Sequence, residues 1–490
     1  MRTTFGAFAI ATSGLYAAQR SLDVTGHNIS NANTEGYSRQ VSRQRATLPM
    51  TGDPAGVLGT GVEIYAVDRI RSGYLDNKYW SQNKNNAEWQ IKETELEGIE
   101  AAFNEPSDTS VRQVMDDFYS MLEELSKKPG DNTNRVAVLE KANTMTVVLN
   151  NIGTQLIGSI RDLNFAVKNK VGEINSLTGR IASLNKSIFN YELDGSKAND
   201  LRDQRSNLVD KLSSIVPIVA SEIPGPNGNN YFEIKTAGIS LVDHTLSRDL
   251  DTTETIVPGI SDLGAGTITS VIWKGTDGTP LSITGGELKG ALNMRDGDGT
   301  NQNYRGIPYY IAKLNQFAKD YSAKFNEVHK QGIDSYGNQG IDFFTVPSGP
   351  EVVNFRNFKV NQQLLDDPRL IAASSAGNGE NNNGNVGKLI AIRDDKNVIT
   401  GVTGTGDDYI KSILSSLAVD SSQSKRMNKN SDALLSQTKL RRMSESGVSL
   451  DEEMTNLVTY QQAYQAAARN ITIFDRILDT TINRMGLVGR

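Results

Sequence analysis

Two short segments contain residues whose types and spacing could bind an ion. Asp296 and Asp298, in RDGDGTNQNYRG, begin like a calcium loop, which needs Gly at its sixth position and Glu at its twelfth. Those positions hold Asn301 and Ile307, so we interpret the segment as a turn. The glycines of GVTGTG, residues 401–406, could cradle a phosphate, but no Gly-Lys-Ser/Thr follows them. This second segment is interpreted as a loop.

Residues that commonly carry catalysis are scarce in the chain. It has no Cys, which excludes disulfides, thiolate metal sites and cysteine nucleophiles. Its three His are too few for a typical multi-histidine metal centre. His27 shows no recognisable triad partners and is interpreted as a capping or packing residue, whereas His244 and His329 are expected at the surface. We therefore predict no enzyme, no cofactor and no metal site.

The overall composition excludes further classes of function. The 490 residues suggest about three domains. Lys and Arg number 51 against 57 Asp and Glu, and a net charge of -6 argues against a general binder of nucleic acid or of an anionic membrane. No apolar run reaches the roughly 18 residues that span a bilayer. Residues 1–20 lack the dense apolar centre of a signal peptide, so we expect no cleaved signal.

Both ends of the chain carry residues at alternating spacings of three and four, the pattern of a coiled-coil seam. The N-terminal seam consists of Phe8, Ala11, Leu15, Ala18, Leu22, Thr25 and Ile29. The C-terminal seam consists of Leu450, Met454, Leu457, Gln461, Tyr464, Ala468, Ile471, Asp475, Leu478, Ile482 and Met485. We predict that these two helices pair with each other or with helices of a partner. Because isolated helices of this length are marginal, we expect the terminal helices to be disordered in the monomer.

The interior combines long helices with a segment rich in turn residues. Periodicity predicts helices at 163–191, 198–215 and 307–328. Strand candidates are 231–235, 239–242, 267–274 and 281–283, with a hairpin turn at 276–278. A second β element, 343–346 with 352–360, precedes a loop at 377–385. The predicted fold is mainly α with inserted β: paired terminal helices, a long-helix bundle with a β-hairpin element, and a small outer β-domain.

These elements predict three domains. The first is a coiled-coil inner domain of residues 1–50 with 446–490. The second is a helical core domain of residues 51–217 with 299–445, and the third is an inserted outer β-domain of residues 218–298.

Several motifs resemble a known family. LYAAQRSLDVTGHNISNANTEGYSRQ, residues 15–40, resembles the N-terminal signature of bacterial flagellar axial proteins, and its Tyr37-Ser38-Arg39-Gln40 ending is similar to the hook-associated protein 1 branch. The run NDLRDQRSNLVDKLS at 199–213 fits the same branch, as do segments 59–79, 285–296 and 325–344. SGVSLDEEMTNLVTYQQAYQAAARNI, residues 446–471, is similar to the C-terminal signature of the family. The 218–280 region carries no such motif.

The resemblance implies a structural protein at the junction between flagellar hook and filament, which offers an assembly surface to the next junction protein and to the filament. It implies four partners: the hook protein, the second hook-associated junction protein, further copies in a ring, and an export chaperone on the C-terminal helix. Neither nucleic acid nor membrane is expected as a partner. The protein would leave the cell unfolded through the flagellar type III export channel and become an extracellular part of the flagellum.

The residues predicted to form the assembly interface lie on the two seams. They are Leu15, Leu22, Ile29, Met454, Leu457, Tyr464, Ile471, Leu478 and Ile482. Three alternatives remain open at this point. The chain could be another axial protein, namely the hook subunit or the second junction protein. It could carry an enzyme inserted in the outer domain, or its β-domain could have an added role as an adhesin.

Overall fold

The computed structural model describes residues 6–49, 59–104, 110–225, 230–256, 267–276, 278–345, 352–375 and 382–484. Met485 of the C-terminal seam, residue 277 of the expected hairpin turn, residue 346 and residues 377–381 of the expected loop lie outside these ranges. The chain is 64% helical, and its strands form small antiparallel sheets. The predicted fold class, mainly α with inserted β, is confirmed.

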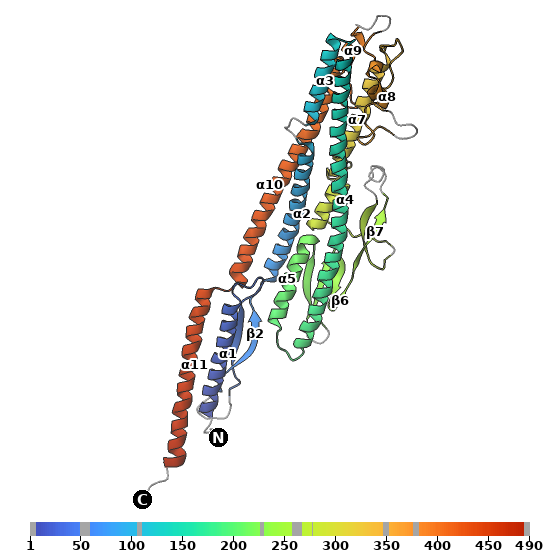
Figure 1. The fold of residues 1–490 in the computed structure, drawn as a ribbon. Helices are drawn as coiled ribbons and strands as arrows, with labels where there is room; N and C mark the ends of the chain where they lie inside the picture. The colour runs from blue at the N-terminus through green and yellow to red at the C-terminus, as the bar shows by residue number, and fades with distance from the viewer. Residues whose placement is uncertain are drawn as a thin grey trace. The chain divides into compact units, whose positions relative to one another are not determined.

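The chain divides into two compact units (Figure 1). Unit 1 comprises residues 1–84, 173–249 and 433–490, and unit 2 comprises residues 85–172 and 250–432. Three long helices contribute residues to both units: α2 (Gly73–Phe103), α4 (Asn132–Tyr191) and α10 (Gly406–Ser446).

Unit 1 contains the terminal helices and two small sheets. Its helices besides those three are α1 (Gly6–Ser30), α5 (Asn199–Ile215), α11 (Leu450–Asp479) and a π-helical turn at Thr480–Arg484. The strands β1 (Gln40–Ala46) and β2 (Val62–Arg69) form an antiparallel pair beside α1. A four-stranded antiparallel sheet consists of β3 (Val219–Pro224), β4 (Asn230–Thr236), β5 (Ile239–Asp243) and β6 (Leu246–Ser247).

Unit 2 is built on helices that enclose an aromatic core. Its further helices are α3 (Val111–Lys127), α6 (Gly286–Asp296), α7 (Ile307–Lys330), α8 (Gln362–Asp366), α9 (Gly384–Ala391) and the short 3-10 turns η2 (Pro368–Leu370) and η3 (Ile392–Asp394). The strands β7 (Leu250–Thr255) and β8 (Ile268–Trp273) form a hairpin. Fully buried rings of Phe118, Tyr321, Phe325, Phe343 and Phe344 pack at centroid distances of 4.8–6.1 Å.

The predicted interior helices are all present, but one is longer than expected, and α2, α3 and α10 were not predicted from periodicity. The segment predicted at 163–191 is the second half of α4, which has 60 residues. Its first half also buries apolar residues at spacings of three and four, namely Val138, Ala142, Met145, Leu149, Ile152 and Leu156. The predictions at 198–215 and 307–328 correspond to α5 and α7.

The β predictions are only partly correct. The candidates at 231–235, 239–242 and 267–274 coincide with β4, β5 and β8. Residues 281–283 form no strand, and the described residues of the second β element join only through one isolated bridge, Phe344 with Val360. Short apolar runs fit a packed loop as well as a strand, and Phe343 and Phe344 are buried by packing. Residues 218–298 are divided between units 1 and 2, and the three-domain division stays a prediction.

The expectation of a surface His329 is wrong. Its side chain is fully buried in unit 2, where Nδ1 lies 2.6 Å from the Ile341 carbonyl oxygen and Nε2 accepts the backbone N–H of Ala372 at 3.0 Å. Burial lowers its pKa to about 4 and keeps the ring neutral. His244 is half-buried as well, stacked on Tyr231 at 4.1 Å. Both residues are packing residues of their units.

Candidate assembly site at the terminal helices

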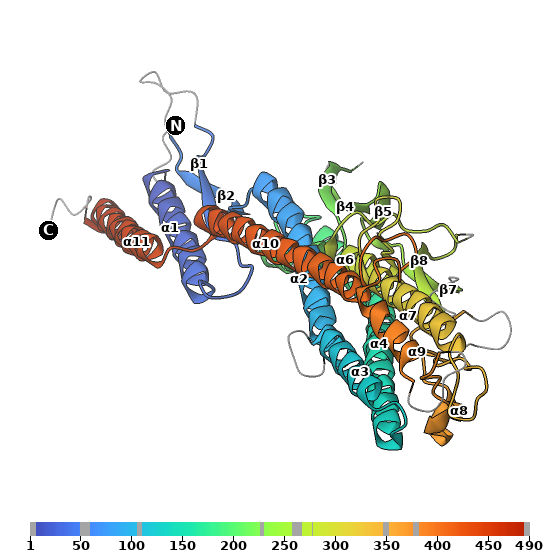
Figure 2. The same ribbon diagram turned by 90° about the horizontal axis from the view of Figure 1, so that it is seen from above.

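The two terminal helices pair within one chain. Helices α1 and α11 lie side by side in both ribbon views (Figures 1 and 2). On α1 the small seam residues Ala11, Ala18 and Thr25 are buried. Because small side chains let two helix backbones approach closely, these positions favour a tight pair. The two seams therefore face each other inside unit 1, which is the first of the two predicted alternatives: the terminal helices pair with each other.

Six of the nine predicted interface residues are half-buried. These are Leu15, Leu22 and Ile29 of α1 and Leu457, Ile471 and Leu478 of α11. The other three are exposed: Met454 by 53%, Tyr464 by 36% and Ile482 by 71%. Helix α1 therefore covers only part of the α11 seam. The remaining seam side chains, Met454, Tyr464 and Ile482, are exposed to solvent.

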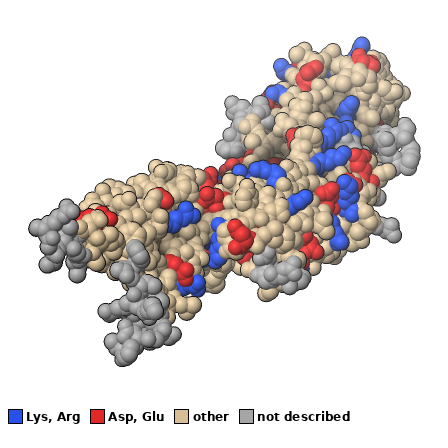
Figure 3. All heavy atoms as spheres, turned by 90° about the horizontal axis from the view of Figure 1, so that it is seen from below, with Lys and Arg blue, Asp and Glu red and all other residues tan. Residues whose placement is uncertain are grey.

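The pair carries very few charges for its length. Helix α1 contains only Arg20 and Asp23, and residues 454–468 of α11 contain none. Figure 3 draws the terminal helices mainly in tan, the colour of uncharged residues. An uncharged, partly apolar helix surface is suited to burial against other helices.

A buried carboxylate joins the two helices at the start of α11. Glu453 is 2% exposed and accepts hydrogen bonds from Asn28 Nδ2 at 3.1 Å and from Arg39 Nε at 2.8 Å. Asn28 also exchanges two hydrogen bonds with the backbone of Gln40, both at 2.9 Å. Because a buried charge that loses its partner costs about 3–5 kcal/mol, these contacts fix the position of α11 on α1.

Tyr37 completes the hydrogen-bonding capacity of Asn28. Its hydroxyl donates to Asn28 Oδ1 at 2.8 Å, and His27 Nδ1 lies 3.0 Å from the same hydroxyl. Burial, together with the carboxylates of Asp200, Asp203 and Glu453, raises the pKa of Tyr37 above its ordinary value. The phenol therefore stays protonated and keeps its role as a donor. His27 packs on the Tyr37 ring, as a packing residue should.

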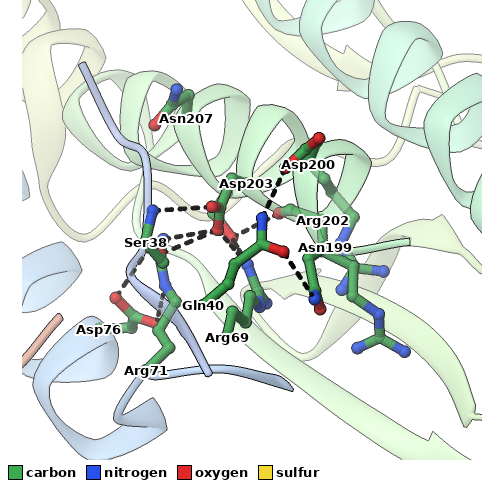
Figure 4. A network of polar contacts seen from close by, with 12 residues as sticks. Ser38, Gln40, Arg69, Arg71, Asp76, Asn199, Asp200, Arg202, Asp203 and Asn207 are labelled. Atoms are coloured by element: carbon green, nitrogen blue, oxygen red, sulfur yellow. Dashed lines mark hydrogen bonds and ion pairs between the residues drawn. The ribbon is translucent and has the colours of Figure 1, made fainter. Parts of the chain in front are cut away.

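A second buried carboxylate attaches the segment after α1 to α5 (Figure 4). Asp203 is 4% exposed and accepts hydrogen bonds from the Ser38 backbone N–H at 2.8 Å and from Ser38 Oγ at 2.9 Å. Arg69 Nη1 of β2 donates to the same carboxylate at 2.7 Å. Arg71 continues the network, since it binds Asp76 through Nε at 2.7 Å and Nη2 at 3.0 Å.

Gln40 adds a link from β1 to the start of α5. Its Nε2 donates to Asp200 Oδ1 at 2.7 Å, and its Oε1 accepts from Asn199 Nδ2 at 3.3 Å. Asn199 Nδ2 also donates to the Val67 carbonyl of β2 at 2.7 Å. The side chain of Gln40 thus links strand β1 to helix α5.

A third carboxylate, Asp210, attaches α10 to the same helix. Arg442 donates to it through Nη1 at 3.1 Å and Nη2 at 2.5 Å, and Trp80 Nε1 donates at 2.7 Å. The Arg442 guanidinium also lies 4.1 Å from the ring centroid of Tyr79. Three carboxylates therefore fix α1, β1, β2, α2, α5, α10 and α11 in one polar network.

Periodicity could not find these polar residues, because a seam pattern selects apolar positions. In the sequence, the only signal at these positions comes from the family motifs. These include Ser38, Arg39, Gln40 and Asp203. The structure shows that they contact one another or the same partners. Asn28 and Glu453 lie within the motifs at 15–40 and 446–471, but nothing in those motifs indicates that the two side chains contact each other. Most of the network residues thus lie within the motifs, whereas Trp80 and Arg442 lie outside them.

The described residues offer neither a metal site nor a membrane-spanning helix. In those ranges no group of three His, Asp or Glu side chains is placed to hold a metal ion. Among the described helices, each is too short or too polar to cross a membrane.

Comparisons with known proteins agree with the motifs. The family model described as "Flagellar hook-associated protein FlgK helical domain" matches residues 96–344. Models described as "Flagellar basal body rod FlgEFG protein C-terminal" and "Flagella basal body rod protein" match residues 441–485 and 8–37. The last two ranges contain most of α11 and α1, respectively.

Individual relatives match over most or all of the chain. The flagellar hook-associated protein 1 of Bacillus subtilis (strain 168) is 32% identical over 511 residues, which cover 100% of both chains. The protein of the same name from Escherichia coli (strain K12) is 25% identical over 561 residues, covering 96% of this chain and 98% of the relative. The solved flagellar hook junction protein FlgK from Burkholderia pseudomallei has a TM-score of 0.63 at 15% identity, covers 76% of this chain and is itself covered completely, so it shares the fold. The chain therefore belongs to the flagellar hook-associated protein 1 family.

Proposed function

We propose that this protein is a structural component of the bacterial flagellum that forms the junction between the hook and the filament. Full-length similarity to hook-associated proteins supports this role. The observation that carries it is the terminal helix pair, whose apolar surface is wider than the contact within one chain. A protein of this design contributes binding surfaces and has no need of catalysis, so we propose that it is not an enzyme.

The assembly interface in this proposal includes both the covered and the exposed parts of the seams. Leu457, Ile471 and Leu478 stabilise the pair, while Met454, Tyr464 and Ile482 contact helices of neighbouring subunits. Such head-to-tail contacts close into a ring or continue as a helix. The hook protein would bind one side of this assembly and the second junction protein the other.

The proposal also covers how the protein is exported and where its β-strands lie in the flagellum. Helix α11 would bind an export chaperone, because an amphipathic helix can lie in the groove of a partner. The chain would travel unfolded through the export channel and assemble outside the cell. The β-strands between residues 218 and 298 would project outward as part of the outer surface.

The test is filament assembly by cells that make this chain in place of their own hook-associated protein 1. Leu457→Asp and Ile471→Asp each place a charge on the α1–α11 contact, so filament subunits should be released into the medium instead of attached. The rest of the chain, between residues 50 and 446, should fold normally, as measured by circular dichroism. The matched control is Val147→Asp on α4, at a position that is 46% exposed and lies outside the proposed interface.

Attached filaments of normal length with either seam variant would contradict the interface assignment. Failure of the unmodified chain to restore any filament would contradict the junction role itself.

A further inference from the structure

Unit 1 contains an open groove that the terminal helix pair does not use. Its volume is about 660 Å³, and β2, α2, α5, β3 and β4 contribute to its lining. Figure 4 shows the side chains of Arg69, Arg71 and Arg202 around the Asp203 network next to it. This volume falls within the roughly 300–1,000 Å³ of pockets that hold a small organic ligand, and it can therefore hold one or two amino-acid side chains of a peptide. It is far larger than one inorganic anion.

The groove has a surplus of basic side chains, although the whole chain has a net charge of -6. Six basic residues line it: Arg43, Arg69, Arg71, Lys197, Arg202 and Arg205. Three acidic residues line it: Asp68, Asp76 and Glu222. Asp203 and Glu192 pair with Arg69 and Arg202 from outside the lining, which reduces the surplus but does not reverse it.

The Arg205 guanidinium of the groove lies close to other arginines and is incompletely satisfied. Arg205 is 4% exposed, and its Nε is buried without a hydrogen-bond partner among the described residues. Burial and the nearby Arg202 and Arg69 lower the pKa of Arg205 to about 10, against the opposing effect of Glu222. Burial and Arg71 likewise lower the pKa of Arg69. Additional negative charge in the groove would relieve this repulsion.

The rim and the walls suit a peptide. Arg43 and Lys197 are about half exposed at the rim, where both contact the single carboxylate of Asp68. Phe232 lies in the wall, 3.8 Å from the Arg205 guanidinium. Arginine forks recognise carboxylates in a bidentate manner, and an apolar wall can hold the aliphatic part of a glutamate.

We propose that this groove binds an acidic peptide segment of a protein partner, whose carboxylates contact Arg43 of β1 and Lys197 at the rim and the arginines of β2 and α5 inside it. The proposal is independent of the role assigned to the terminal helices, because none of their residues lines the groove.

The experiment measures binding of fluorescein-labelled hexaglutamate to the full chain by fluorescence anisotropy, at low and at physiological salt. The groove variant is Arg43→Glu with Lys197→Glu, both at solvent-exposed positions. The control variant is Arg45→Glu with Lys235→Glu, which changes the net charge equally at exposed positions outside the groove. Thermal unfolding followed by circular dichroism checks that both variants fold.

We expect the groove variant to bind at least about tenfold more weakly than the control variant, a factor that corresponds to one lost charged contact. Absence of binding by the unmodified chain, or equal weakening in both variants, overturns the proposal. Competition by inorganic phosphate at the same concentration as unlabelled peptide overturns it as well, because the groove would then bind any small anion.

Discussion

Gly36 shows at the scale of one residue why the GYSRQ motif begins with glycine. Its φ is +76°, and a Cβ added there would lie 1.7 Å from Oδ1 of Asn207 on α5. Asn207 in turn donates to the Glu35 carbonyl oxygen at 3.0 Å, which attaches the turn to the helix. Both the backbone conformation and the close approach require that no side chain be present.

We predict that Gly36→Ala lowers the free energy of unfolding by about 1–3 kcal/mol, from backbone strain and the displaced Asn207. The matched control is Gly26→Ala in α1, where an added Cβ meets nothing and φ is not positive. That change should be neutral or stabilising by up to about 1 kcal/mol, since Ala favours a helix over Gly. Urea unfolding of both variants measures the difference, and equal values would contradict the account.

His329 makes the stability of unit 2 depend on pH. Its pKa is about 4 in the folded chain and about 6.5 when unfolded. Between these values only the unfolded chain binds the proton, so the stabilising contribution is complete above about pH 6.5 and decreases as pH falls toward 4. The shift corresponds to about 3 kcal/mol.

The variant His329→Gln removes this titration, because Gln can still donate to Ile341 and accept from Ala372. We predict that the unmodified chain loses more stability than His329→Gln between pH 7 and pH 5, as measured by urea unfolding at each pH. Parallel pH profiles of the two proteins would show that His329 does not titrate as described.

At the scale of elements, Arg442 holds three helices of unit 1 together. Its guanidinium binds Asp210 of α5 in a bidentate manner, lies 3.4 Å from Asp76 of α2, and stacks on Tyr79 of the same helix. A lysine ammonium is a point charge and cannot reproduce the planar fork or the stacking.

We therefore predict that Arg442→Lys lowers the free energy of unfolding by about 2 kcal/mol, the scale of lost charged hydrogen bonds. The adjacent Arg441→Lys makes the same chemical change at an exposed position and should alter stability by less than about 0.5 kcal/mol. Chemical unfolding of both variants distinguishes them. Equal, small effects would mean that the bidentate contact adds little.

At the scale of the whole molecule, the stability of the α1–α11 pair in the free chain decides when the terminal helices become ordered. The seams predict termini that order fully only on assembly, although the buried Glu453 contacts join the two helices in this structure. We predict that limited proteolysis of the purified monomer, with fragments mapped by mass spectrometry, removes residues 1–50 and 446–490 rapidly and leaves a stable core. Resistant ends would contradict that prediction and would leave the family assignment unchanged.

The sequence alone determined the helical terminal seams, helices α5 and α7, the second half of α4, three of the strands and the family. Each of these depends on local spacing or on a contiguous motif, such as Leu15, Leu22 and Ile29 at steps of seven. Local periodicity is set by the geometry of one helix or one strand, so it can be found without knowing what the element contacts.

Only the tertiary structure decided which polar residues hold the terminal segments in place. Asn28 and Glu453 are separated by 425 residues, and Ser38 and Asp203 by 165, yet each pair is hydrogen-bonded and buried. The burial of His329 and the division of the β-strands between two units were likewise absent from local patterns. A buried polar group is satisfied by whichever partner the packing of distant elements brings to it, and that choice is made only when the chain folds.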